Sequence, residues 1–156
     1  RLITKIDHMK YLLFMILVPF IGLSQKVKYN KDTHMISIDG KEEFKIEKSG
    51  CGLGTPDCHF DIHNLKSEKV IRVNYRTYQS PVYKTEANPN GKVQYFEYIF
   101  LKSGGKAEAE CLGLRPEKVA KFLWKNDLLK NGDLDEAAAK QFALVHGTPY
   151  SQRIKF

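Results

Sequence analysis

The spacing of apolar residues changes once along this chain, at Pro116, and this change restricts the possible folds more than any other feature. Upstream of Pro116, short segments alternate apolar and polar side chains, as Ile71 and Val73 alternate with Arg72 and Asn74. Alternation with a period of two is typical of half-buried β-strands. Downstream of Pro116, apolar residues recur three or four positions apart, which indicates helices. Strands followed by helices predict an α+β domain.

The upstream region predicts about six or seven strands in one antiparallel sheet. Asp39-Gly40 separates two of these strands, and Asp-Gly is among the strongest signals for a tight hairpin turn. Residues 93–101 carry apolar side chains on both faces, which indicates a strand that is covered on both sides. The candidate strands are the segments 26–29, 34–39, 43–48, 59–65, 69–78, 93–102 and 106–114.

The downstream region predicts two helices that pack on the aromatic face of the sheet. Pro116 suits the first position of a helix, and the apolar spacing extends the first helix to Leu129, just before Asn131-Gly132. Asp133 and the glutamate three residues later form a variant of the capping box that marks a helix start. We therefore expect Asp133 to cap the second helix.

Residues 9–24 predict a cleavable secretory signal peptide. A lysine is followed by an apolar run over residues 11–21, and small side chains at Gly22 and Ser24 precede the expected cleavage site. The run is shorter than the about 20 apolar residues that a membrane-spanning helix needs. Residues 1–8 do not fit this pattern, and we interpret them as an upstream extension that is not translated or is unstructured.

The expected mature protein is a single exported domain, residues 25–156, in the periplasm or outside the cell. Two alternatives remain open for the apolar segment: a core helix in a protein that is not exported, and an uncleaved membrane anchor. The chain has a formal net charge of +7, and its basic residues are spread singly without a nucleic-acid motif. We expect no nucleic-acid partner, and membrane contact only through a retained N-terminal segment.

The sequence contains three cysteines, Cys51, Cys58 and Cys111. Cys51 and Cys58 flank a stretch with two glycines and one proline, which can close a small loop. Because an exported protein can hold disulfides, we expect this pair to be bridged. Cys111 then stays free on the buried side of a strand, although sequence alone leaves all three pairings open.

His59, Asp61 and His63 occupy alternate positions of one predicted strand, so their side chains share a face. Two imidazoles and a carboxylate are a plausible set of zinc ligands. In a straight strand His59 and His63 lie about 13 Å apart, so one ion reaches both only if the strand bulges or a loop adds ligands. Arg72 and Arg76 on the same face would repel a cation. The alternative is a solvent-facing strand whose ionic residues pair across the sheet.

A candidate binding surface follows from Arg72, Asn74, Arg76 and Tyr78, which occupy alternate positions of another predicted strand. Arginine and tyrosine are enriched at recognition sites. The alternative is that these residues form the rim of the sheet. No catalytic residue is expected, because the serines lie outside a G-x-S-x-G motif and a cysteine nucleophile would have to stay reduced after export.

Together these features favour a small exported, non-catalytic domain that binds a protein, a peptide or an envelope polymer without a cofactor. One alternative is an exported metal-dependent hydrolase that holds zinc on His59, Asp61 and His63. Another is a membrane-associated envelope protein that retains its apolar N-terminal helix.

Overall fold

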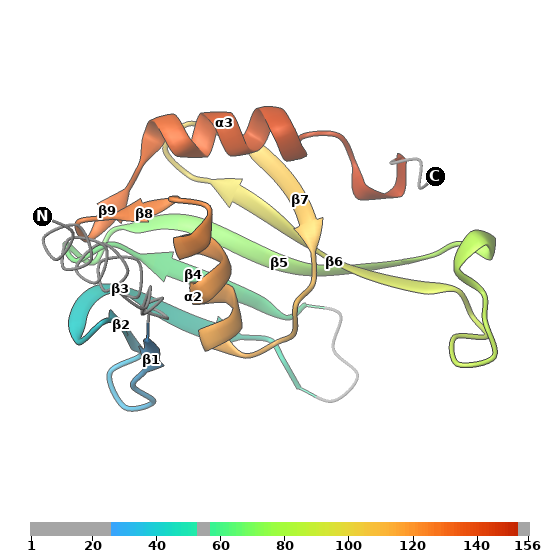
Figure 1. The fold of residues 1–156 in the computed structure, drawn as a ribbon, viewed down its shortest axis with the longest axis horizontal. Helices are drawn as coiled ribbons and strands as arrows, with labels where there is room; N and C mark the ends of the chain where they lie inside the picture. Colours follow the sequence, from blue (N-terminus) through green and yellow to red (C-terminus); the bar gives the residue numbers. More distant parts are fainter. Residues whose placement is uncertain (1–25, 53–56, 153–156) are drawn as a thin grey trace, which may run out of the picture.

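The computed structural model describes residues 26–52 and 57–152 and shows an α+β fold, in which one antiparallel sheet carries two α-helices (Figure 1). The sheet has seven strands, and their order across the sheet is their order along the chain. The fold class and the expected strand number are therefore confirmed. The proposed extension 1–8 and signal peptide 9–24 lie outside the described residues. The strands are β1 (Val27–Tyr29), β2 (Met35–Ile38), β3 (Lys41–Ser49), β4 (His59–His63), β5 (Lys69–Gln79), β6 (Lys92–Phe100) and β7 (Lys106–Glu110).

One face of the sheet forms the core together with the helices α2 (Pro116–Lys125) and α3 (Glu136–His146). The ring of Tyr98 on β6 stacks on Phe122 of α2, with centroids 5.5 Å apart, and meets the edge of Phe142 of α3 at the same distance. The helices therefore cover the aromatic face, as expected. On the opposite face of β6, Tyr95 and Ile99 are only half-buried. The strand is therefore fully covered on one face, not on both faces as the sequence predicted.

Helix α2 begins with Pro116 at its first position, as expected, but it ends at Lys125 rather than near Leu129. The side chain of Asn126 donates a hydrogen bond back to the carbonyl of Phe122, and Asp127 then adopts a positive φ of 56°. An Asn or Asp residue tolerates this left-handed conformation, which an α-helix does not contain. The chain therefore leaves the helix one turn before the expected end.

The segment expected to finish the first helix instead forms a two-stranded hairpin, β8 (Leu129–Lys130) and β9 (Asp133–Leu134). Its turn residues Asn131 and Gly132 have φ values of 53° and 79°. Two positive φ angles in a two-residue loop are the geometry that favours Asn-Gly in hairpins. Leu129 is 1% exposed, so its apolar side chain packs in the core from a strand rather than from a helix.

The expected cap of the second helix is also wrong by two residues. Asp133 belongs to β9, where its carboxylate accepts a hydrogen bond from the backbone N–H of Leu134. The residue that caps α3 is Asp135, whose carboxylate accepts a hydrogen bond of 2.9 Å from the N–H of Ala138. Two aspartates flank Leu134, and the capping-box spacing fits Asp133 alone, so this pattern selected the wrong one.

The β8–β9 turn is locked onto the β4–β5 turn by Asn64, which is 3% exposed. Its side-chain amide donates to Glu68 at 2.8 Å and to Asp133 at 3.0 Å, while its carbonyl accepts from the backbone N–H groups of Lys66 and Glu68. The backbone N–H of Leu65 also donates to the carbonyl of Gly132. One buried amide thus satisfies two carboxylates and two backbone donors.

Strands β5 and β6 continue beyond the sheet as a two-stranded arm, residues 76–94 (Figure 1). Pairing of β5 with β4 stops at Asn74, and pairing of β6 with β7 stops at Tyr95. The tip is held by Asn88, whose amide donates to the carbonyls of Tyr83 and Lys92 and whose oxygen accepts from the N–H of Lys92. The arm therefore ends in an ordered tip.

Candidate functional site

The candidate site residues from the sequence lie on the polar face of the sheet, and several of them form ion pairs there. Asp61 on β4 is 8% exposed and accepts two hydrogen bonds from Arg72 on β5, at 2.8 and 3.0 Å, and one from Lys69 at 2.7 Å. Burial alone would raise the pKa of Asp61, but the hydrogen bonds from Arg72 and Lys69 outweigh burial and lower this pKa to about 2. The carboxylate is therefore fully ionised and already neutralised.

The predicted metal ligands share this face, as expected, but their side chains do not converge on a common point. His59 Nε2 lies 4.0 Å from a carboxylate oxygen of Asp61, and its Nδ1 bonds to the carbonyl of Asp57 at 2.9 Å. Because a carbonyl only accepts, Nδ1 carries the proton. The Nδ1 of His63 is buried and makes no hydrogen bond with any described residue.

A zinc ion at this place would meet an aspartate that two cationic side chains already engage. Within residues 26–52 and 57–152, no group of three or more His, Cys, Asp and Glu side chains is arranged to hold a metal ion. The zinc hypothesis stays a prediction without a supporting contact.

The predicted binding residues Arg72, Asn74, Arg76 and Tyr78 do lie together on this face, at alternate positions of β5. Arg72 is engaged by Asp61, while Arg76 and Asn74 both donate to one carboxylate oxygen of Glu97, at 3.1 and 2.9 Å. Tyr78 meets the edge of the Tyr95 ring, with centroids 6.0 Å apart. A polar hollow of about 290 Å³ is lined by Arg72, Asn74 and Arg76 but not by Tyr78. The guanidinium groups of Arg72 and Arg76 already pair with Asp61 and Glu97, which leaves little unneutralised charge for a ligand.

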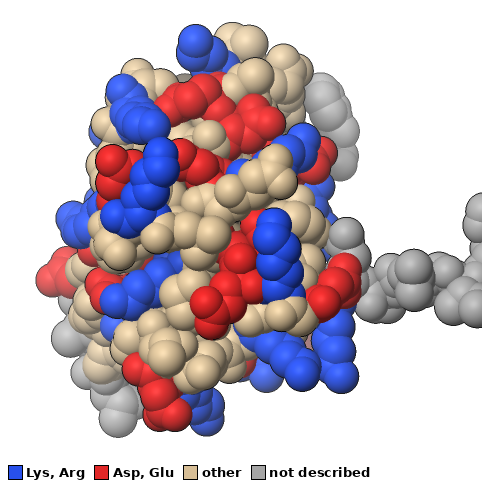
Figure 2. Space-filling model, turned by 90° about the vertical axis from the view of Figure 1, so that its left-hand side faces the viewer, with Lys and Arg blue, Asp and Glu red and all other residues tan. Residues whose placement is uncertain are grey.

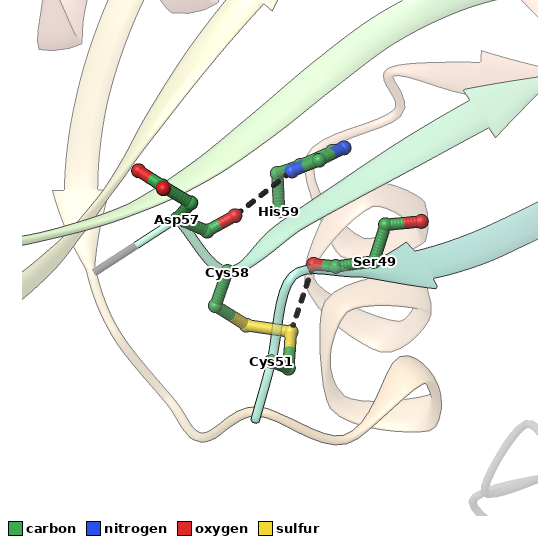
Figure 3. Close-up of a disulfide and its surroundings, with 5 residues drawn as sticks. All are labelled: Ser49, Cys51, Asp57, Cys58 and His59. Atoms are coloured by element: carbon green, nitrogen blue, oxygen red, sulfur yellow. Dashed lines mark hydrogen bonds between the residues drawn. A yellow bond between two sulfur atoms is a disulfide. The ribbon is translucent and has the colours of Figure 1, made fainter. Parts of the chain in front are cut away.

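The expected disulfide is present between Cys51 and Cys58 (Figure 3). It joins the end of β3 to the start of β4, and the Sγ atom of Cys51 lies 3.2 Å from the carbonyl oxygen of Ser49. The third cysteine, Cys111, is free and packs against the core, and burial raises the pKa of its thiol. A raised thiol pKa disfavours the thiolate that nucleophilic chemistry needs.

A groove of about 810 Å³ between α2 and β1 is the site that sequence reasoning missed. Its apolar floor comes from Val27 on β1, Leu112 in the connection before α2, and Phe122 on α2. Leu112 is 46% exposed, which is high for a large apolar side chain beside a concave surface. A volume of this size lies within the range of natural ligand sites, which is about 300–1,000 Å³.

The rim of the groove is strongly basic. Glu117 is the one acidic residue among the lining side chains, and none of the basic ones forms an ion pair with a carboxylate of the described residues. The amino end of α2 opens on the same side, and a helix dipole adds partial positive charge there. The basic lining residues are Lys26, Arg115, Lys118, Lys121 and Lys125.

The basic stripe has a sequence signal. Arg115, Lys118, Lys121 and Lys125 recur three or four positions apart, so they share one face of a helix. This spacing was missed because the basic residues are spread singly when the whole chain is considered. The apolar floor had no local signal, because β1 and α2 are about 90 residues apart in the chain and meet only through the fold.

The largely basic rim of the groove differs from the mixed charge of the face drawn in Figure 2. Figure 2 shows the end of the molecule that lies on the left in Figure 1, where Lys and Arg alternate with Asp and Glu and neither sign forms a continuous field. Mixed charge of this kind is typical of a solvated surface. The rim of the α2 groove, where the described lining residues include five basic side chains and one acidic side chain, Glu117, does not follow this mixed pattern.

Within the part of the chain that the structure describes, no helix has the length and apolar character of a membrane span. Comparisons of the sequence with protein-family models and with curated proteins, and of the fold with solved structures, gave no match. The functional interpretation therefore rests on the geometry of the two surfaces. The polar face satisfies its own charges, and the α2 groove does not.

Proposed function

We propose that this domain is a non-catalytic binding protein that takes up an anionic ligand in the α2 groove. The observation that supports the proposal is the rim of unpaired cations over an apolar floor. Charges of one sign at a concave, low-dielectric surface concentrate ligands of the opposite sign. Protein, peptide and envelope polymer ligands can all carry such negative charge.

Charge reversal at two rim positions tests this proposal. The protein and its Lys118→Glu/Lys121→Glu variant are titrated calorimetrically with poly-glutamate, polygalacturonate and polyphosphate at low salt. We expect at least one probe to bind, and the variant to bind it about tenfold or more weakly, since opposed like charges cost several kcal/mol. Binding should also weaken as salt is added.

The matched control is Lys84→Glu/Lys92→Glu, which makes the same change in net charge on the exposed arm. This control should bind the probe nearly as well as the unmodified protein. If none of the three probes binds, or if the control loses as much affinity as the rim variant, the proposal is wrong. The second result would mean that only overall charge matters.

We also propose that the domain works after export. The Cys51–Cys58 disulfide supports export, because such bonds persist in oxidising compartments. The test is the intact mass of protein recovered from the cell envelope or the medium, after alkylation without reductant. A chain beginning at Gln25 with one alkylated thiol supports export and signal cleavage. A chain that still contains Met9 and carries three alkylated thiols contradicts both.

A further inference from the structure

We infer that the ligand of the α2 groove is an extended acidic peptide segment that carries one bulky apolar side chain. This inference rests on the proposed function, because it names the class of ligand for the same site. Three features of the groove carry it: the length of the basic stripe, the apolar floor, and the edge of the sheet at β1.

The basic stripe is long compared with a single acidic group. Arg115, the N-cap of α2, and Lys125, its last residue, are ten residues apart, which corresponds to about 15 Å along the helix axis. Lys26 on the opposite wall widens this field. A ligand with one carboxylate or phosphate would meet only one part of it. An extended peptide advances about 3.3 Å per residue, so four or five residues with several carboxylates span the stripe.

The apolar floor favours a peptide with an apolar side chain over a purely ionic polymer. Val27, Leu112 and Phe122 expose apolar surface at the bottom of the groove. A polyphosphate or an acidic polysaccharide would leave this surface in contact with water or with polar groups. A leucine or phenylalanine side chain would remove it from water, which is favourable at about 25 cal/mol per Å² of apolar area.

The first strand supplies the third feature. β1 stands at the edge of the sheet order, and among the described strands only β2 pairs with it. Extended peptides add to such an edge through main-chain hydrogen bonds, while alternate side chains enter the neighbouring pockets. Val27 lines the groove from this strand, so a peptide along β1 would pass directly over the apolar floor.

The experiment compares two synthetic peptides, acetyl-Asp-Glu-Leu-Glu-Asp-amide and the same peptide with Ser in place of Leu. Their affinities are measured for the unmodified protein, for Leu112→Ser, and for Leu101→Ser as a control. Leu101 is 45% exposed, close to the 46% of Leu112, but does not line the groove. Polygalacturonate and vesicles of anionic lipid are measured in parallel.

We expect the Leu peptide to bind the unmodified protein about tenfold more tightly than the Ser peptide, from burial of one leucine side chain. This advantage should vanish in Leu112→Ser and persist in Leu101→Ser. Equal affinity for the two peptides, or tighter binding of polygalacturonate or vesicles, overturns the peptide inference. The proposed function survives that result as long as Lys118→Glu/Lys121→Glu weakens whichever probe binds more than Lys84→Glu/Lys92→Glu does, and it fails if no probe binds or if the two variants bind equally well.

Discussion

Replacing Asp61 by Asn should destabilise the protein at neutral pH and remove a defined part of its acid sensitivity. The pKa of Asp61 is about 2 in the folded chain, against about 3.9 for an ordinary aspartate. A carboxyl with a lowered pKa stabilises the fold above its unfolded pKa. This stabilisation is lost as the pH falls through the folded value. The difference corresponds to between about 2 and 3 kcal/mol, present at pH 5 and above and lost between about pH 4 and pH 2.

The neutral amide leaves Arg72 and Lys69 facing each other without a carboxylate. Their side chains are 39% and 37% exposed, so water partly compensates both charges. We therefore expect Asp61→Asn to lower the free energy of unfolding at pH 7 by about 2 kcal/mol, rather than by the about 3–5 kcal/mol typical of a fully buried pair.

The assay is urea denaturation of the protein and of Asp61→Asn at several pH values between 7 and 2. Other carboxylates titrate in the same range, so the informative quantity is the difference in unfolding free energy between the two proteins. It should shrink from about 2 kcal/mol at pH 7 toward zero near pH 2. Asp32→Asn, at an exposed turn, serves as the control. A difference that stays constant with pH, or that is absent at pH 7, would refute the role assigned to Asp61.

Three further changes test how the fold is held together. Replacing Cys51 and Cys58 by Ser should cost about 2–3 kcal/mol in urea denaturation, because a small loop is released in the unfolded chain; no loss would refute that role for the bridge. Asn64→Ala should cost about 2 kcal/mol by leaving two backbone donors and two carboxylates unsatisfied, and unchanged stability would contradict this account. Phe142→Ala should lower stability by about 3–5 kcal/mol, measured in the same way, and a loss below 1 kcal/mol would show that α3 is not anchored by this ring.

The sheet could be predicted because the residue pattern that indicates each strand lies within that strand. Alternation of apolar and polar residues sets which side of each strand is buried, and a shift of one residue would expose the whole apolar set. Phe60 and Ile62 of β4 thus face the core together, while Asp61 between them faces the polar side. The disulfide was predictable for a similar reason, since Cys51 and Cys58 belong to one short loop.

The first helix shows where periodicity stops being informative. Leu128 and Leu129 are both fully buried, so they look like a continuation of the apolar stripe of α2. Burial is equally compatible with a short strand, and helix and strand patterns are ambiguous over so few residues. The deciding information was the turn chemistry of Asn131 and Gly132, which specifies a hairpin rather than a helix end.

The polar face shows why side-chain partners could not be predicted as well as their positions. That Arg72 and Arg76 share a face follows from the strand period. That Asp61 lies opposite Arg72, and Glu97 opposite Asn74, depends on the register of three strands joined by turns of different lengths. A slip of two residues would keep the same faces and change every ion pair.

The two surfaces differ in how their basic residues are paired. On the polar face, cationic side chains of β5 are matched by Asp61 and Glu97 on neighbouring strands, so this face contributes little net charge. On α2, the cations project from one face of a helix across from Lys26, with Glu117 as the acid among the lining residues. Because exposed charge costs little in water but attracts an anionic partner, we propose the α2 groove as the ligand site among the described residues.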